Sequence, residues 1–265
     1  MSLPAPTPGA FAVVTGASAG IGSALARGLA RRGHHLMLVA RRKNRLEELA
    51  AELHGRYGVR VEVYQCDLAD RDARAALVKE LAERKVSVLC NNAGFATFGD
   101  LGHADPTRER EQVELNVTAV HELTLAVLPG MLRRGSGAIL ITGSTAGHQP
   151  FPGNATYAAS KAFANSFAES LHAELRNTGL TTTLLAPGPA ATEFNQAAGI
   201  GHRDRLISRL AISAQQTAEE GLRGLERGER VVVPGLVAKL QTVSGTYTPR
   251  AVLLPILRLV SRGLS

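Results

Sequence analysis

Short apolar runs alternate with longer segments of helical period along almost the whole chain. Several of the runs are continuously apolar, which is typical of parallel strands covered by helices on both faces. Because strand–helix–strand units cross over in the right-handed sense, this alternation predicts an open, doubly wound α/β sheet. The expected strands are Phe11–Thr15, Leu36–Ala40, Val59–Gln65, Val86–Cys90, Ala138–Thr142, Leu180–Leu185 and Val231–Val233. The expected helices are Gly20–Arg32, Asn44–Tyr57, Arg71–Arg84, Thr107–Arg133, Thr156–Asn177 and Thr217–Arg227.

Capping residues predict where some of these helices begin. Asp105–Pro106 combines an N-cap side chain with proline at the first helical position. Thr217–Glu220 has the spacing of a capping box, and Asn44–Glu47 resembles one. We expect helices to start at these three places.

No internal repeat or long linker divides residues 1–265, so we predict a single domain. The segment Pro187–Ile212 has no clear periodicity, and long irregular loops in compact domains are usually functional. We therefore expect a substrate loop or lid near residues 187–212. The tail near 246–265 contains the apolar stretch Arg250–Val260, which we expect to pack against the body or a partner subunit, with a membrane surface as the alternative.

The charge balance does not indicate a nucleic-acid partner. The chain has 30 Lys plus Arg against 23 Asp plus Glu, a formal charge of +7, but the basic residues form short groups, mostly beside acidic ones. There is no Trp and only 4% of residues are aromatic, so bases would find few stacking partners. We interpret the excess as ordinary solvated surface.

Cysteine content and hydrophobic runs constrain the compartment. Cys66 and Cys90 are the two cysteines, which is too few for a disulfide framework, and the N-terminal residues do not resemble a secretory signal. No run approaches the roughly 20 apolar residues of a membrane span. We expect a cytoplasmic protein without a membrane span. No His/Cys/Asp cluster has metal-ligand spacing, so we expect no metal.

The first strand runs directly into the turn Thr15–Gly22, T-G-A-S-A-G-I-G, and a helix follows. Glycines allow a sharp turn and a close backbone approach to a pyrophosphate, and the helix N-terminus attracts the phosphates. Because the turn lies at the first strand–helix connection, the sequence predicts a dinucleotide site. The candidate cofactor-binding residues here are Gly16, Ser18, Gly20, Ile21 and Gly22.

Preference between NAD and NADP is decided near the end of the second strand. The sequence there is Ala40-Arg41-Arg42, with no acidic residue before Glu47. An acidic side chain would repel a 2′-phosphate, whereas the planar guanidinium of Arg41 could pair with it. We therefore expect NADP(H), with NAD as the less favoured cofactor.

Tyr157 and Lys161 are four residues apart in a helical segment, so they share a face. A free tyrosine has a pKa near ~10, and a neighbouring ammonium would lower it towards the value that acid–base chemistry needs. Ser144 follows the apolar strand Ala138–Thr142, at the edge where open α/β sheets bind ligands. Its hydroxyl could donate to a carbonyl oxygen that gains negative charge.

With these residues the chain resembles the short-chain dehydrogenase/reductases, in their compact branch. The resemblance runs from Phe11 to about Thr192 and covers several motifs in the family's order. The motifs are the glycine turn Thr15–Gly22, Asn91–Gly94 after the fourth strand, Asn116 in the next helix, Ser144 placed 13 residues before the Tyr157–Lys161 motif, Pro187–Gly188, and Thr192.

The resemblance implies hydride transfer between a nicotinamide and a carbonyl or alcohol. Tyr157 would be the general acid or base, with Lys161 lowering its pKa and holding the nicotinamide ribose. Ser144 would orient the substrate oxygen, and Asn116 would position a water in the proton relay. The implied cofactor contacts are Asp67 and Leu68 at the adenine, Asn92, Ala93 and Gly94 at the riboses, Tyr157 and Lys161 as above, and Pro187, Gly188 and Thr192 at the nicotinamide.

The segment before Tyr157 lacks the Gln-x-Asn-Tyr pattern of the ketoacyl-carrier-protein reductases, which disfavours a role in fatty-acid synthesis. Substrate-facing candidates in the loops are mostly aromatic and indicate an apolar small-molecule substrate. These candidates are Phe95, Phe98, His148, Phe151 and Phe194.

The segment Tyr157–Asn177 has apolar residues on several faces, which indicates burial on several faces. In relatives the corresponding helix forms a subunit interface, so we expect a homodimer or homotetramer. Two alternatives stay open: a catalytically idle NADP-binding redox sensor or regulatory module, and an epimerase or dehydratase that uses the cofactor catalytically. The intact set of Ser144, Tyr157 and Lys161 argues against the first. The short C-terminal region disfavours the second.

Overall fold

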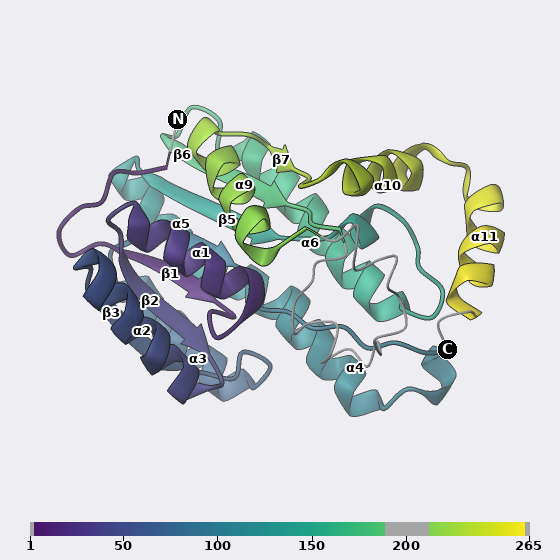
Figure 1. The fold of residues 1–265 in the computed structure, drawn as a ribbon, viewed down its shortest axis with the longest axis horizontal. Coiled ribbons are helices and arrows are strands. Elements are labelled where there is room, and N and C mark those ends of the chain that lie inside the picture. The colour runs from purple at the N-terminus through teal and green to yellow at the C-terminus, as the bar shows by residue number, and fades with distance from the viewer. Residues whose placement is uncertain (1–2, 189–211, 263–265) are drawn as a thin grey trace.

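The centre of the molecule is a seven-stranded parallel sheet with the strand order β3-β2-β1-β4-β5-β6-β7 (Figure 1). The structure is a computed structural model that describes residues 3–188 and 212–262. All six strand pairs are parallel, as the alternating pattern predicts. The strands are β1 Phe11–Thr15, β2 His35–Ala40, β3 Val61–Gln65, β4 Val86–Asn91, β5 Gly137–Thr142, β6 Leu180–Leu185 and β7 Val231–Val232.

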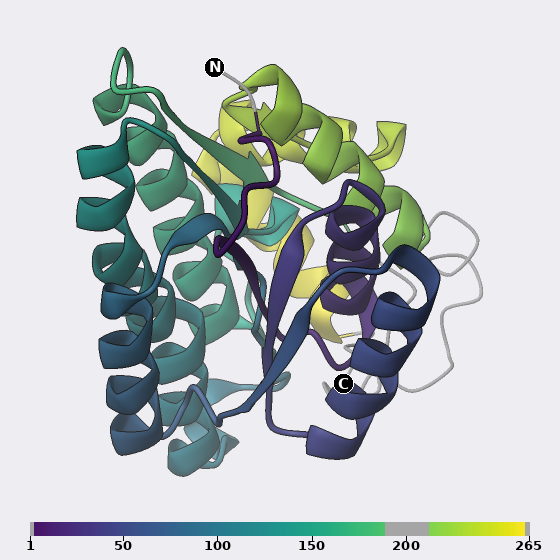
Figure 2. The ribbon, with the colours of Figure 1, turned by 90° about the vertical axis from the view of Figure 1, so that its left-hand side faces the viewer.

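Helices cover both faces of this sheet (Figure 2). One core lies under α1, α2 and α9, and a second core lies under α3, α5 and α6. The helices are α1 Gly20–Arg31, α2 Lys43–Tyr57, α3 Arg71–Glu83, α4 Pro106–Val113, α5 Ala119–Arg134, α6 Ala155–Glu174, α9 Ala214–Arg227, α10 Leu236–Tyr247 and α11 Arg250–Arg262. Two short 3-10 turns, η1 Leu101–His103 and η3 Thr145–His148, and a π-helical turn, η2 Glu114–Thr118, complete the described elements.

Successive residues of a strand enter opposite cores. In β1, Ala12 and Val14 lie in the core beneath α1, whereas Val13 lies in the core beneath α5. All three are fully buried. This two-sided burial explains why the strands read as continuous apolar runs and confirms the doubly wound α/β architecture.

The connections reverse direction at the centre of the sheet. β1 pairs with β2 on one side and with β4 on the other. In open α/β sheets, ligands bind in the crevice outside the carboxyl ends of the strands at such a switch point. The turn after β1 and the loop after β4 both lie there.

The capping predictions had mixed outcomes. Asp105 caps α4 by accepting from the Thr107 N–H at 2.8 Å, as predicted. The Asn44–Glu47 prediction was wrong, because α2 begins at Lys43 without a side-chain cap. The Thr217–Glu220 prediction was also wrong: Ser213 caps α9 through the Gln216 N–H, and Thr217 lies inside the helix.

The segment predicted as one helix, Thr107–Arg133, consists of α4, η2 and α5. A π-helical turn widens the helix by one residue and is frequent at functional sites. By length and composition, Pro106–Arg134 could also cross a membrane, with 39% of its most apolar window buried. It packs against α3 and the sheet and carries buried Asn116, so we interpret it as a core helix.

The C-terminal part contains a helix that the sequence pattern did not predict. Leu236–Tyr247 forms α10, and the predicted apolar tail Arg250–Val260 lies in α11. Both lie beyond β7, at one end of the molecule (Figure 1). Of the predicted lid near 187–212, only Pro187, Gly188 and Ile212 are among the described residues.

Candidate active site

Tyr157 and Lys161 project from the first turns of α6 towards the end of β5, where Ser144 follows the strand. The hydroxyls of Ser144 and Tyr157 are hydrogen-bonded to each other. Lys161 is buried, donates to the Thr142 carbonyl at 2.8 Å, and places Nζ 5.8 Å from the centre of the Tyr157 ring. The structure therefore brings together the three residues that the sequence singled out for chemistry.

Burial dominates the electrostatics of this cluster. It raises the pKa of Tyr157 to about 12, and the hydrogen bond with Ser144 opposes that rise. Burial also lowers the pKa of Lys161 to about 8, because the ammonium has lost solvent. The net shift of the Tyr157 pKa in the protein alone is therefore upward, and a lowering of that pKa by Lys161 stays a prediction. At neutral pH the phenol is protonated and the amine is charged.

Asn165, one turn beyond Lys161, fixes the backbone at Ser144. Its side-chain amide donates to the Ser144 carbonyl at 3.0 Å, and its Oδ1 accepts from the Ser144 N–H at 3.3 Å. The fit is close, since a Cβ added to Gly143 would lie 2.0 Å from Asn165 Oδ1. Sequence reasoning missed Asn165, although its spacing of four from Lys161 places it on the catalytic face of α6.

Asn116 lies in the π-helical turn and is buried. Its Nδ2 donates to the Phe95 carbonyl at 2.9 Å and to the Ser160 hydroxyl at 3.0 Å. A Cβ added to Gly94 would lie 3.0 Å from Asn116 Oδ1 and 3.4 Å from Lys161 Nζ. Asn116, Gly94 and Lys161 therefore meet at one point beside the catalytic cluster.

The glycine turn after β1 packs closely against the loop after β4. Gly16 has φ +66°, and a Cβ there would lie 2.9 Å from Ala93 Cα. At Gly22 a Cβ would lie 2.2 Å from the Gly16 carbonyl oxygen. α1 begins at Gly20 without a side-chain cap and without an acidic residue in its first turn. Its N-terminal amides and positive dipole fit a pyrophosphate.

Asn92 ties the ends of the central strands together. Its backbone N–H donates to Thr15 Oγ1 at 2.9 Å, and its side chain donates to the Thr15 carbonyl at 3.0 Å. The Ala93 N–H also donates to Thr15 Oγ1, at 3.0 Å. These bonds place the predicted ribose-contacting segment beside the glycine turn.

Two arginines border the space beyond β2. Arg41 forms an exposed ion pair of 3.6 Å with Asp67, whose other oxygen accepts from the Ala69 N–H. Arg42, which sequence reasoning did not single out, donates to Ser18 Oγ in the glycine turn at 3.0 Å. The candidate cofactor residues of β1, β2 and β3 therefore lie at one edge.

The Leu68 carbonyl at this edge is held by Arg74, a buried residue that sequence reasoning also missed. Arg74 Nη1 donates to that carbonyl at 2.8 Å. The same guanidinium pairs with Glu114 of the π-helical turn at 2.7 Å and with Glu122 of α5 at 2.8 Å. One side chain thus connects the predicted adenine loop to the helix that carries Asn116.

The nicotinamide side is partly described. The Pro187 carbonyl accepts from the Thr145 N–H at 3.0 Å, and a Cβ on Gly188 would lie 3.0 Å from Ala238 Cβ of α10. Thr192 lies outside the described residues.

The substrate-facing candidates occupy different environments. Phe95 lies beneath the guanidinium of Arg108, 4.4 Å from its ring centre, Phe98 is exposed and Phe151 is half-buried. His148 is half-buried, and burial lowers its pKa. Phe194 lies outside the described residues.

Comparison with known proteins decides the family. The short chain dehydrogenase family model matches residues 10–201. This chain belongs to the short-chain dehydrogenase family, and it is an oxidoreductase. It is 40% identical over 186 residues to sulfoacetaldehyde reductase 2 of Chromohalobacter salexigens, covering 69% of this chain and 73% of that protein. It is 38% identical over 194 residues to a very-long-chain 3-oxoacyl-CoA reductase of Anas platyrhynchos, covering 71% of this chain and 62% of that protein.

Solved structures of short-chain dehydrogenases match the fold along most of the chain. A short-chain dehydrogenase of Sphingobium yanoikuyae in complex with NADPH has a TM-score of 0.81 and 34% identity, covering 92% of this chain and 95% of that chain. The bulky-bulky ketone specific alcohol dehydrogenase of Comamonas testosteroni has a TM-score of 0.76 and 29% identity, covering 91% and 95%. The NADPH in the Sphingobium structure supports a nicotinamide cofactor.

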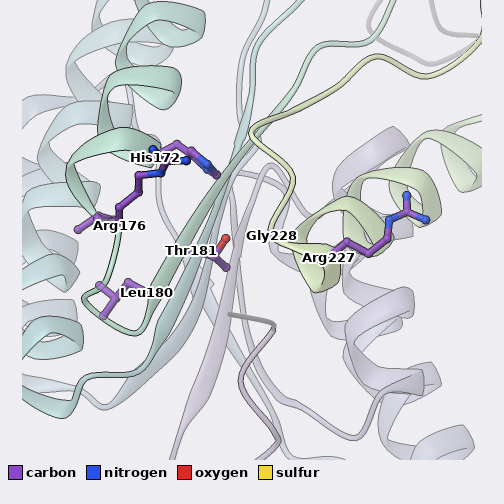
Figure 3. A pocket seen from close by; sticks show the side chains of 7 residues that line it. His172, Arg176, Leu180, Thr181, Arg227 and Gly228 are labelled. Atoms are coloured by element: carbon purple, nitrogen blue, oxygen red, sulfur yellow. The ribbon is translucent and has the colours of Figure 1, made fainter.

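A hollow of about 220 Å³ lies away from this dehydrogenase site, at the amino end of β6 (Figure 3). His172 of α6 and Arg176, in the turn after α6, line one side, and Arg227 at the end of α9 lies on the other. Arg227 pairs with Glu229, and His172 contacts the Thr182 carbonyl, so both side chains have structural partners.

Within residues 3–188 and 212–262, no group of three metal-ligating side chains occurs.

Proposed function

We propose that this short-chain dehydrogenase uses NADP(H) to transfer a hydride between the nicotinamide and a carbonyl or secondary alcohol of an apolar small molecule. The observation that carries the proposal is the hydrogen bond between the Ser144 and Tyr157 hydroxyls beside buried Lys161. A redox sensor would have no use for this arrangement, because binding alone requires no proton donor.

In reduction, Tyr157 gives its phenolic proton to the carbonyl oxygen while Ser144 donates a hydrogen bond to the same atom. The raised pKa of Tyr157 keeps the phenol protonated and suits it to act as an acid. The nicotinamide, when bound, supplies or accepts the hydride. In oxidation, the phenolate of Tyr157 removes the hydroxyl proton of the alcohol, and the Lys161 ammonium stabilises that phenolate. Asn116 would position the water that returns the proton.

Preference for NADP(H) is assigned to Arg41, with Arg42 as a second cation. The Arg41–Asp67 pair is exposed and therefore weak, so Arg41 can turn to a 2′-phosphate at little cost. Arg42 already lies against Ser18 of the glycine turn. NADPH in the Sphingobium relative agrees with this assignment.

Two observations support an apolar carbonyl or alcohol as the substrate: the residues of the loops and the names of the relatives. Phe95, Phe98 and Phe151 lie in the loops after β4 and β5, at the carboxyl edge of the sheet, and provide apolar surface. The relatives named above are a sulfoacetaldehyde reductase, a 3-oxoacyl-CoA reductase and a dehydrogenase for bulky-bulky ketones. All three names describe carbonyl chemistry, and the last describes large ketones.

The test is NADPH oxidation by the full chain against ketones and aldehydes of graded size and polarity. We expect turnover with apolar ketones and weak turnover with charged aldehydes of similar size. Tight NADPH binding without turnover on any carbonyl would instead support the sensor.

A homo-oligomer in the cytoplasm completes the proposal. Phe163 and Phe167 of α6 are stacked 5.6 Å apart and half-buried, with His121 of α5 against them. Leu125, on the same helix as His121, is exposed. This apolar surface fits a subunit contact, and light scattering that gives 28.0 kDa would refute it. Both cysteines are buried free thiols, which suits a reducing compartment.

A further inference from the structure

α10 attaches to the body through its small residues. A Cβ on Gly245 would lie 2.7 Å from Gln149 Oε1, and Ala238 packs 3.0 Å from the position of a Cβ on Gly188. Arg250, just after α10, donates to the His148 carbonyl. One side of α10 is therefore fixed against the segment that follows Ser144.

The opposite side of α10 carries an apolar stripe. Leu236, Leu240, Val243 and Tyr247 are spaced at i, i+4, i+7 and i+11, which aligns them along one face of a helix. Their exposed fractions are 74%, 63%, 56% and 80%. At 100° per residue this face points directly away from Ala238 and Gly245, so it lies on the outer surface.

α11 repeats the pattern. Val252, Ile256 and Leu259 are spaced at i, i+4 and i+7 and are all more than half exposed. Leu253 is buried on the inner side. Two consecutive helices thus present apolar stripes to the outside, at the end of the molecule where they lie beyond the sheet (Figure 1). These exposed apolar residues form continuous stripes, unlike the single exposed leucines common on protein surfaces. Continuous apolar surface of this kind marks an interaction site.

The net positive charge of the C-terminal region favours an anionic partner for the two apolar stripes. From Val231 to the end, the chain has four cations, Lys239, Arg250, Arg258 and Arg262, and no Asp or Glu. A two-fold contact between two copies would place like-charged surfaces against each other, without an acidic side chain from either stripe. An anionic lipid surface supplies the opposite charge and accepts the apolar side chains.

We propose that α10 and α11 dock on an anionic membrane surface, with the stripe defined by Leu236, Leu240, Val243 and Tyr247 lying in the interface. Docking would place the Ser144 segment, on the inner side of α10, close to the bilayer. The proposal concerns peripheral binding and does not depend on which carbonyl the enzyme reduces.

Flotation of the full chain with vesicles tests the proposal. We expect binding to vesicles of phosphatidylcholine mixed with phosphatidylglycerol, weaker binding to phosphatidylcholine alone, and loss of binding at high salt. The double variant Lys239→Gln/Arg258→Gln should bind about tenfold more weakly or worse, since each cation near the surface contributes about fivefold. Leu240→Gln/Val243→Gln should also abolish flotation. Leu132→Gln, an exposed leucine on α5, is the matched control and should bind like wild type.

A fluorescent reporter gives an independent readout, because the chain has no Trp. The emission of Tyr247→Trp should shift to the blue with anionic vesicles, whereas that of Leu132→Trp should not move. Three results would overturn the proposal. The first is a wild-type protein that does not float with the anionic vesicles. The second is flotation of both double variants to the same extent as wild type. Stripe variants that convert a solution oligomer to monomer without changing lipid binding would show that the stripe joins copies of the chain.

Discussion

Replacing Asn165 with leucine should damage both the stability and the chemistry of the site. Leucine has the branching of asparagine but cannot hydrogen-bond, so the Ser144 N–H would lose its partner, and the Ser144 carbonyl would keep only its bond from the Gly147 N–H. Both residues are buried, with Ser144 8% and Asn165 4% exposed. Leaving a buried polar group unpaired costs about 1–3 kcal/mol. With one buried group left unpaired, we expect Asn165→Leu to lose about 1–3 kcal/mol of unfolding free energy.

The catalytic effect follows from the position of the serine hydroxyl. Asn165 holds the Ser144 backbone through both its N–H and its carbonyl, so releasing these bonds should let Ser144 Oγ move relative to Tyr157 and lower kcat. A loss of about tenfold to a hundredfold corresponds to a weakened donor at the developing oxyanion. The KM for NADPH should change little, because the glycine turn is not touched.

Denaturant unfolding and steady-state kinetics measure the two effects. Thr182→Val is the matched control: Thr182 is fully buried, and its hydroxyl has no hydrogen-bond partner, so its removal should be neutral or stabilising. Asn165→Asp keeps the acceptor for the Ser144 N–H but loses the donor to the carbonyl, and it should lie between wild type and the leucine variant in kcat. The reasoning is refuted if Asn165→Leu unfolds like wild type and keeps its kcat.

Three other predictions concern the cofactor and pH. Arg41→Asp should lower the ratio of NADPH to NADH efficiency about tenfold or more, because a charge-assisted bond to the 2′-phosphate is lost; an unchanged ratio contradicts the assignment. His34 is buried, and burial lowers its pKa to about 4 from 6.5. Since the unfolded chain binds the extra proton, stability should fall as pH drops from 6.5 to 4, and urea unfolding of His34→Leu should show a smaller fall. The raised pKa of Tyr157 predicts that carbonyl reduction is flat in kcat between pH 6 and 7, where the phenol is protonated and Lys161, with its pKa lowered to about 8, is charged; alcohol oxidation, which needs the phenolate, rises with pH over this range. A kcat for reduction that decreases as the pH is lowered from 7 to 6 would count against this role.

The layout of the fold could be predicted because its signals are local and repeated. β1 and β6 have the predicted bounds, and the other strands differ by one or two residues, since two-sided burial makes each strand continuously apolar. Helix starts were harder to predict. A cap at Thr217 and a cap at Ser213 have similar sequence signatures, and packing of α9 on the sheet favoured the longer helix.

The missed parts depend on contacts between distant residues. In the sequence, Asn165 and Arg74 resemble polar residues on the surface of a helix. Their roles depend on contacts with Ser144 and Leu68, which only the folded chain brings close to them. The π-helical turn at Glu114–Thr118 has no local signature, and α10 was missed because Gly245 and several Thr and Ser residues weaken its helical pattern. The pKa of Tyr157 depends on burial, which residue spacing does not report.

The most direct test of the central claim compares wild type with Tyr157→Phe, which removes one hydroxyl. NADPH binding is measured by titration, and turnover is measured by NADPH oxidation with the best ketone of the panel. The account predicts unchanged folding, NADPH affinity within a few-fold of wild type, and a loss of turnover of about a hundredfold or more, since general acid catalysis contributes that much. A Tyr157→Phe protein that binds NADPH and reduces the ketone at the wild-type rate would contradict the account.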